Sequence, residues 1–143
     1  MTVMGTVSFK KILVGVDGSE NALRAVELAS ALAKGMGAEI TLAHVITPSD
    51  HDLLIGKATY MDKDAKLGGE RLRAAEELLA RLGVKHRSVV ELGHPAEQLM
   101  SLAKDFDMVV VGTRGLSPFK EVLIGSSSHR LAQSGRVPVL IVP

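Results

Sequence analysis

The sequence has no cysteine and few aromatic residues, and each shortage excludes a class of function. Without cysteine there can be no disulfide, no zinc–thiolate site and no thiolate nucleophile. One tyrosine, three phenylalanines and no tryptophan are too few for the stacking platforms that bind single-stranded nucleic acids. The core must therefore be aliphatic, and any chemistry must come from backbone groups, hydroxyls and charged side chains.

Long apolar runs and an excess of charge are absent as well. No run approaches the roughly 18 residues that span a bilayer, and residues 1–11 lack the apolar stretch of a signal peptide. Seventeen basic and sixteen acidic residues give a net charge of +1, which offers no electrostatic footprint for duplex nucleic acid or an anionic membrane. We therefore expect a cytoplasmic protein with neither nucleic acid nor membrane as a partner.

The length of 143 residues suits a single globular domain. Residues 1–9 contain small polar residues and glycine without a regular pattern, and we expect them to form a flexible N-terminal leader. Residues 10–143 contain no internal repeat and no linker. They are predicted to form one domain.

Apolar β-branched runs alternate with segments of helical periodicity through this domain. Strands are predicted at 12–16, 40–46, 84–91, 108–111 and 137–142, and helices at 19–34, 72–82, from residue 95 onward and at 127–133. Residues 51–63 have no clear period and are predicted to be a mobile connection. Gly35 and Gly83 are interpreted as helix stops, and Pro138 indicates an edge position for the last strand. The alternation is typical of a parallel α/β sheet covered by helices on both faces, which binds ligands beyond the carboxyl ends of its strands.

A glycine-rich loop follows the fourth predicted strand. It runs Gly112-Thr113-Arg114-Gly115, then nine residues, then Gly125-Ser126-Ser127-Ser128 at the start of a helix. Glycine lets backbone N–H groups converge on an anion, and a helix start adds unpaired N–H donors, so this loop is either a phosphate-binding loop or a turn followed by a helix cap. It matches neither the Walker A pattern nor the Gly-x-Gly-x-x-Gly of dinucleotide-binding enzymes.

The histidines and serines give no second site. The five histidines lack metal-ligand spacing, and His44, inside an apolar strand, is interpreted as a core or interface residue with its polar atoms satisfied. No Gly-x-Ser-x-Gly elbow surrounds the serines at 126–128, which excludes acyl-transfer hydrolysis of that kind. The charged residues from Glu70 to Arg81 are interpreted as the solvated face of a helix.

The glycine spacing Gly112-x₂-Gly115-x₉-Gly125-Ser126 resembles that of ATP-binding universal stress proteins. Four further segments resemble the same family in the same order: 11–19 with the strand and aspartate at Asp17, 42–45, 93–95 and 137–142. The resemblance covers nearly the whole chain. It implies a five-stranded parallel sheet in the order 3-2-1-4-5, like that of the adenine nucleotide alpha hydrolases, with ATP across the ends of strands 1 and 4.

The resemblance also implies which residues hold the nucleotide. Asp17 would border the adenine and ribose side together with Gly15 and Val16, the backbone of Val45 would meet the adenine edge, and Val111 and Gly112 would pass under the ribose. The phosphates would be held by Arg114, Gly115, Gly125, Ser126 and Ser127. A turn and helix cap remains an alternative role for Asp17. Mg²⁺ is expected to accompany the triphosphate, because phosphate oxygens and carboxylates are its usual ligands.

The family resemblance favours a nucleotide-dependent regulatory or stress-response module that pairs as a homodimer through the edge strand Val137 to Val142. A slow magnesium-dependent ATPase or a nucleotidyl-transferring enzyme is the alternative, although the sequence offers no evident general base near the γ-phosphate. A module with this fold that binds no nucleotide is a third possibility, against which the intact glycine spacing counts.

Overall fold

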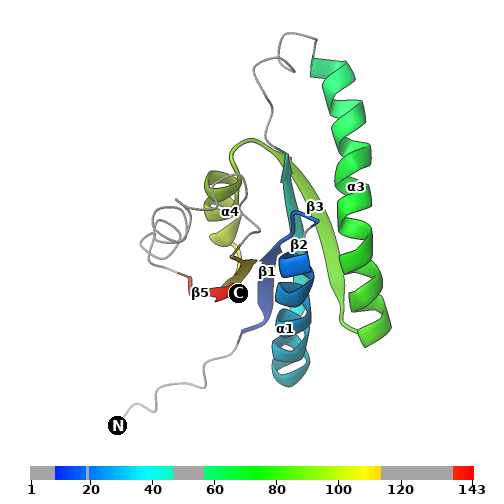
Figure 1. Cartoon of the computed structure of the whole chain (residues 1–143). Helices are drawn as coiled ribbons and strands as arrows, with labels where there is room; N and C mark the ends of the chain where they lie inside the picture. Colours follow the sequence, from blue (N-terminus) through cyan, green and yellow to red (C-terminus); the bar gives the residue numbers. More distant parts are fainter. Residues whose placement is uncertain (1–8, 19, 47–56, 114–136) are drawn as a thin grey trace.

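The computed structural model describes residues 9–18, 20–46, 57–113 and 137–143, with the backbone alone for 57–68. The described elements are β1 (Lys11–Gly15), α1 (Glu20–Met36), β2 (Glu39–Ile46), α3 (Lys57–Leu82), β3 (His86–Leu92), α4 (Pro95–Ala103), β4 (Met108–Gly112) and β5 (Val139–Val142) (Figure 1). Of the expected leader, residues 1–8 lie outside this description, as does the predicted helix at 127–133.

The strands form one sheet in the order β3-β2-β1-β4-β5, and every neighbouring pair is parallel. The predicted fold class and strand order are therefore confirmed. β1 lies at the centre, with Gly15 opposite Ala43 of β2 and Val14 opposite Val110 of β4. Because all strands run the same way, the ends of β1, β2 and β4 meet at one edge of the sheet. Below we call this the carboxyl edge.

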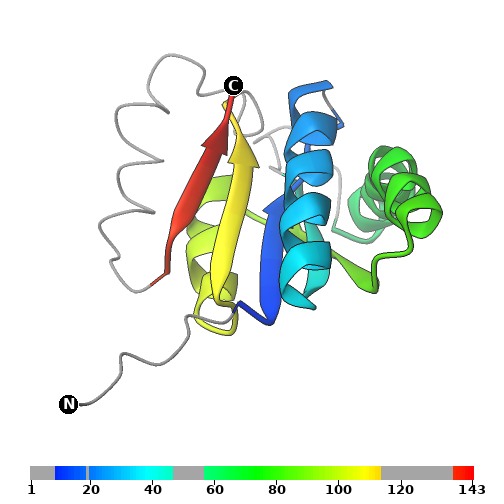
Figure 2. The same ribbon diagram turned by 90° about the horizontal axis from the view of Figure 1, so that it is seen from below.

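Helices cover both faces of the sheet. α1 and α3 lie on one face and α4 on the other (Figure 1). Alternate residues of β1 supply the two apolar layers: Ile12 and Val14 pack with α1 and α3, whereas Leu13 packs with Leu99 of α4. The fully buried apolar side chains of both layers are aliphatic, as the composition requires, and the partly buried Phe106 packs against the α4 layer. β5 forms the outer edge of the sheet beside β4 (Figure 2), which confirms the edge position indicated by Pro138.

Two sequence predictions fail at helix ends. Residues 57–63 were expected in a mobile connection, but α3 begins at Lys57 and runs for 26 residues. This first part of α3 shows no apolar stripe in the sequence, so periodicity gave no signal, and the helix propagates from the anchored part beyond it. Gly35 is not a helix stop, because α1 continues to Met36 and Gly37 takes the left-handed conformation with φ +66°. Gly83, with φ +73°, does follow the end of α3 as predicted.

The remaining strand boundaries differ by one or two residues. β3 starts at His86 rather than residue 84, and β5 starts at Val139 rather than 137. Pro138 stands outside β5, but its carbonyl accepts a hydrogen bond from the N–H of Val109 at 2.9 Å. A proline can accept but not donate in a sheet ladder, which places it naturally at the start of an edge strand.

Candidate functional site

The turn after β1 lies at the centre of the carboxyl edge. Gly15 ends the strand. The N–H of Val16 donates to the carbonyl of Ala43 at 2.8 Å, so hydrogen bonding to β2 continues one residue beyond the end of β1. Asp17 comes next and is half-buried, and Gly18 has a φ of +88°, which an L side chain rarely adopts. α1 begins at Glu20. The sequence-predicted trio of Gly15, Val16 and Asp17 therefore lies where the strand passes into the helix.

The end of β4 lies against the first turn of α1. A Cβ on Gly112 would stand 2.9 Å from the backbone oxygen of Asn21. On the other side the N–H of Thr113 donates to the carbonyl of Val142 at 2.9 Å. Gly112 is therefore required for close approach of strand and helix, whatever it does for a ligand. The constraint at Gly15 is milder, because a Cβ there would meet side-chain atoms, Leu99 Cδ1 and Val111 Cγ1, each at 3.2 Å.

Val45 and Val111 complete the described part of the predicted site. Val111 is buried in β4, and Val45 is half-buried next to the last residue of β2. The ends of β1, β2 and β4 are consecutive in the sheet, so the structure gathers the six described residues at one edge. The other five, Arg114, Gly115, Gly125, Ser126 and Ser127, lie outside the described residues.

His44 brings a polar side chain into this edge. It is 1% exposed, and its Nδ1 lies 2.7 Å from the carbonyl oxygen of Val16. Its Nε2 lies 3.5 Å from Nη1 of Arg71 in α3. The sequence interpretation of His44 as a satisfied core residue is confirmed. The contact of Arg71 was missed, because its position in the helix indicates only a solvated face.

Burial lowers the pKa of His44, because a charged imidazole is poorly solvated in the core. The hydrogen bond with the Val16 carbonyl opposes this shift, since it favours a protonated nitrogen. Arg71 lowers the pKa further by charge repulsion, and the carboxylate of Asp17 raises it. The balance favours a neutral imidazole.

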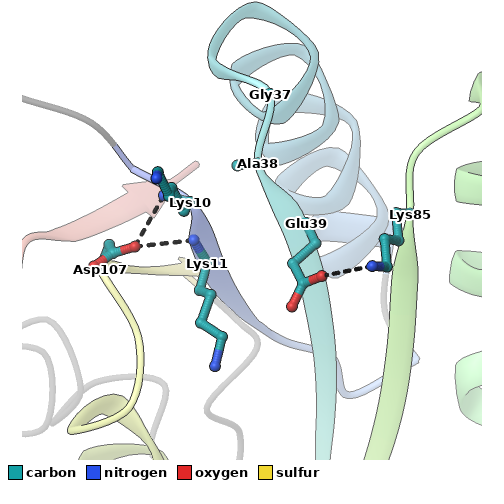
Figure 3. Close-up of a pocket in the computed structure, with 7 residues that line it drawn as sticks. All are labelled: Lys10, Lys11, Gly37, Ala38, Glu39, Lys85 and Asp107. Carbon is teal, nitrogen blue, oxygen red and sulfur yellow. Dashed lines mark hydrogen bonds and ion pairs between the residues drawn. The ribbon is translucent and has the colours of Figure 1, made fainter.

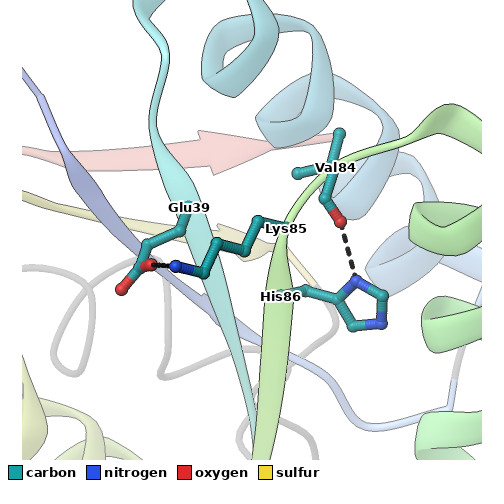
Figure 4. Close-up of polar contacts among 4 residues, drawn as sticks. All are labelled: Glu39, Val84, Lys85 and His86. Carbon is teal, nitrogen blue, oxygen red and sulfur yellow. Dashed lines mark hydrogen bonds and ion pairs between the residues drawn. The ribbon is translucent and has the colours of Figure 1, made fainter.

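A separate groove of about 580 Å³ lies at the opposite, amino-terminal end of the strands (Figure 3). It is lined by Lys10, Lys11, Gly37, Ala38, Glu39, Lys85 and Asp107. Its two acidic side chains bind within the protein: Asp107 Oδ2 accepts the backbone N–H groups of Lys10 and Lys11, each at 2.9 Å, and Glu39 pairs with Lys85 at 3.5 Å (Figure 4). These contacts join the starts of neighbouring strands, and we interpret them as structural.

A further local contact lies beside the groove residue Lys85. His86 Nδ1 lies 2.8 Å from the carbonyl oxygen of Val84, just before β3 (Figure 4). The described residues contain no group of three or more histidine, aspartate or glutamate side chains placed to hold a metal ion. Nor does any helix among them have the length and apolar character needed to cross a membrane.

Solved structures share this architecture. A universal stress protein in complex with cAMP superposes with a TM-score of 0.72 and is 29% identical, covering 95% of this chain and 98% of the other. The protein MJ0577 of Methanocaldococcus jannaschii gives a TM-score of 0.79 at 27% identity, covering 95% and 96% of the two chains.

Sequence comparison agrees over the same span. The universal stress protein YxiE of Bacillus subtilis is 34% identical over 146 aligned positions, which cover 94% of this chain and 99% of the relative. The model of the universal stress protein family matches residues 8–143. With nearly the whole domain matched in sequence and in fold, the chain belongs to the universal stress protein family.

Proposed function

We propose that the chain binds ATP at the carboxyl edge and acts as a nucleotide-dependent regulatory or stress-response module. The observation that carries this proposal is the meeting of the first turn of α1 with the end of β4, two segments about 90 residues apart in sequence, through the close approach of Gly112 and Asn21. β1 is the strand from which the order runs outward in both directions, and open parallel sheets bind ligands at such a point. The family relative in complex with cAMP supports an adenine nucleotide as the ligand.

The first turn of α1 suits an anionic ligand. The helix dipole adds partial positive charge there, which the acidic Glu20 in the same turn partly offsets. In the proposed binding mode, Asp17 lies on the adenine and ribose side, the backbone of Val45 meets the adenine edge, and Val111 and Gly112 pass under the ribose. Gly15 and Val16 border the same side. The phosphates are assigned to Arg114, Gly115, Gly125, Ser126 and Ser127 on the family resemblance of their spacing.

We propose that Mg²⁺ binds together with the triphosphate of ATP. The described residues offer no cluster of three ligands for a metal ion. Phosphate oxygens can supply the missing ligands, because Mg²⁺ keeps several waters and takes few protein ligands. We therefore expect ATP affinity to rise when Mg²⁺ is added, whereas Mg²⁺ without nucleotide leaves the protein unchanged in a thermal melt.

Calorimetric titration of ATP, GTP and cAMP into the purified protein tests the ligand. ATP binding that is weakened at least tenfold by Gly115→Val supports the proposal. Gly35→Ala is the matched control, because Gly35 has no atom within 4 Å of an added Cβ and lies in α1 far from its first turn. Absence of ATP binding by the parent protein, with no nucleotide released on denaturation, would overturn it.

A turnover assay separates regulation from catalysis. The regulatory proposal expects one bound ATP and no multiple turnovers in the presence of Mg²⁺. Multiple turnovers that Asp17→Ala abolishes would favour the magnesium-dependent ATPase or nucleotidyl-transferring enzyme instead. Phosphate release and adenylate formation are both measured, because they distinguish those two reactions.

We also propose that two copies pair through β5. Among the described strands, β4 alone neighbours β5, so β5 is an edge strand, and an edge strand can pair with a further strand. The segment Val139–Val142 is wholly apolar, and Ile141 is 38% exposed. Antiparallel pairing with the same strand of a second copy would satisfy the backbone and cover this side chain.

A further inference from the structure

His44 is the one ionisable side chain that is buried among the described residues. It lies in β2 with apolar strand neighbours on either side, Ala43 and Val45. Burying an imidazole costs free energy unless its two nitrogens find partners. Both nitrogens have contacts here. Nδ1 contacts the Val16 carbonyl at the carboxyl edge, and Nε2 contacts Arg71 of α3.

The two contacts fix the proton on the ring. The carbonyl of Val16 has no hydrogen, so at 2.7 Å the Nδ1 of His44 must donate. A guanidinium has no acceptor, so Nε2 must present its lone pair to Arg71. The imidazole is therefore the neutral Nδ1–H form. Of the two contacts, the 2.7 Å bond is the stronger and the 3.5 Å contact is at the limit of hydrogen bonding.

Arg71 also touches the turn itself. Its Cγ would lie 3.1 Å from a Cβ on Gly18, and its Cβ and Cδ at 3.5 Å. The aliphatic stem of this exposed arginine thus runs along the glycine whose φ is +88°. One side chain of α3 therefore contacts the imidazole under the turn and lies beside Gly18 in the turn.

We propose that His44 and Arg71 are positioning residues that hold the turn Val16–Gly18 in one conformation and thereby set the affinity of the carboxyl edge for its nucleotide. The effect on nucleotide affinity rests on the proposed function, because Asp17, in the middle of this turn, is assigned there to the adenine and ribose side of the nucleotide. His44 binds the carbonyl on one side of Asp17, and the stem of Arg71 lies beside Gly18 on the other. Neither residue needs to touch the ligand.

Substitutions at position 44 separate the two contacts. In His44→Asn the amide nitrogen can replace Nδ1 and keep the bond to Val16, whereas His44→Gln places an amide oxygen near the position of Nε2 and loses it. Since the Val16 bond is the shorter, we expect His44→Gln to weaken ATP binding about three- to tenfold and His44→Asn less than threefold. The reverse order would overturn the assignment of the stronger contact.

Substitutions at position 71 test the arginine. Arg71→Met keeps an aliphatic stem over Gly18 but loses the donor, and we expect about a threefold loss of ATP affinity, which Arg71→Lys restores in part. Arg73→Met is the matched control, because Arg73 is also exposed on α3 but lies two residues further on, and so on another side of the helix. It should bind ATP as the parent does.

Imidazole nitrogen NMR of the ligand-free protein gives a readout that does not depend on nucleotide. We expect the Nδ1–H form at His44, and a shift of the Gly18 amide signal in Arg71→Met but not in Arg73→Met. An Nε2–H imidazole, or a Gly18 signal indifferent to Arg71, would overturn the positioning of the turn. Thermal melts of all variants confirm that each is folded.

Different results would overturn ATP binding and the positioning role of His44 and Arg71. If the parent protein binds no ATP, the proposed function and the link to affinity both fall, whereas the NMR result still decides whether the pair holds the turn. If the parent binds ATP and both His44→Gln and Arg71→Met bind it equally well, the proposed function stands and the positioning role in affinity is overturned.

Discussion

A Cβ on Gly112 would lie 2.9 Å from the backbone oxygen of Asn21, closer than real Cβ atoms come to such an atom. The end of β4 and the first turn of α1 are therefore packed backbone against backbone. Relief would require one of the two elements to shift, because a backbone carbonyl cannot rotate away as a flexible side chain would. Glycine at this position thus has a packing requirement that precedes any role toward a ligand.

Gly112→Ala should lower the free energy of unfolding by about 1–3 kcal/mol, the usual cost of overpacking a tight site. Because the shift occurs at the carboxyl edge, ATP affinity should fall in the same variant. Urea unfolding and calorimetry measure the two effects.

Gly35→Ala is again the control for Gly112→Ala, since it adds the same methyl group in open space within α1 and should raise stability by up to about 1 kcal/mol. Equal stability of Gly112→Ala and the parent would contradict the close packing.

The stability of the protein should depend on pH through His44. Its pKa is lowered in the folded state, chiefly by burial, from an ordinary value of 6.5. The unfolded chain therefore takes up the proton first as the pH falls, so this contribution to stability is complete above pH 6.5 and is lost as the pH falls through the folded pKa. Each pKa unit of lowering corresponds to about 1.4 kcal/mol.

Urea unfolding at pH 8 and pH 5 measures this dependence. His44→Asn keeps a donor for Val16 but does not titrate, so its loss of stability between the two pH values should be smaller than that of the parent. An identical loss in both proteins would show that other groups carry the pH dependence.

Ile141→Lys should prevent the proposed pairing of β5. A lysine on an edge strand disfavours the addition of another strand, because its charge would be buried against the partner. We expect light scattering after gel filtration to give a dimer for the parent and a monomer for Ile141→Lys. Leu28→Lys is the control, since Leu28 is 41% exposed but lies on α1 and not on the edge strand. A parent protein that is already monomeric would contradict the proposal.

The fold was predictable because the strands carry unbroken aliphatic runs. Ile12, Leu13 and Val14 are each 0% exposed, so both faces of β1 are buried, and a continuous apolar run is the pattern of such a strand. The ends of the helices were harder to predict. The helical start of α3 at Lys57 has no apolar stripe, and Gly35 and Gly37 are indistinguishable as helix stops until the backbone shows which one takes a positive φ.

The candidate site was predictable only in part. The family resemblance predicts Asp17 and Gly112 as site residues, and the topology brings both to the carboxyl edge. The contact of Gly112 with Asn21 could not be predicted, since it depends on where α1 crosses the sheet. The contact of Arg71 with His44 could not be predicted either. The two residues are 27 positions apart, and the sequence around Arg71 indicates a solvent-exposed helix face. His44 itself gave a signal, as a lone ionisable residue in an apolar strand.

Asp107 joins the amino-terminal ends of β4 and β1, and its loss should destabilise the protein without affecting the nucleotide. Its Oδ2 accepts the N–H groups of Lys10 and Lys11, each at 2.9 Å. Asp107→Ala removes both bonds and should cost about 1–3 kcal/mol, whereas Asp107→Asn keeps an oxygen acceptor and should cost less. ATP affinity should be unchanged in both, because this carboxylate lies at the opposite end of the strands from Gly112. Urea unfolding and calorimetry of the two variants check both expectations, and a loss of ATP affinity in Asp107→Asn would contradict the assignment of this groove as structural.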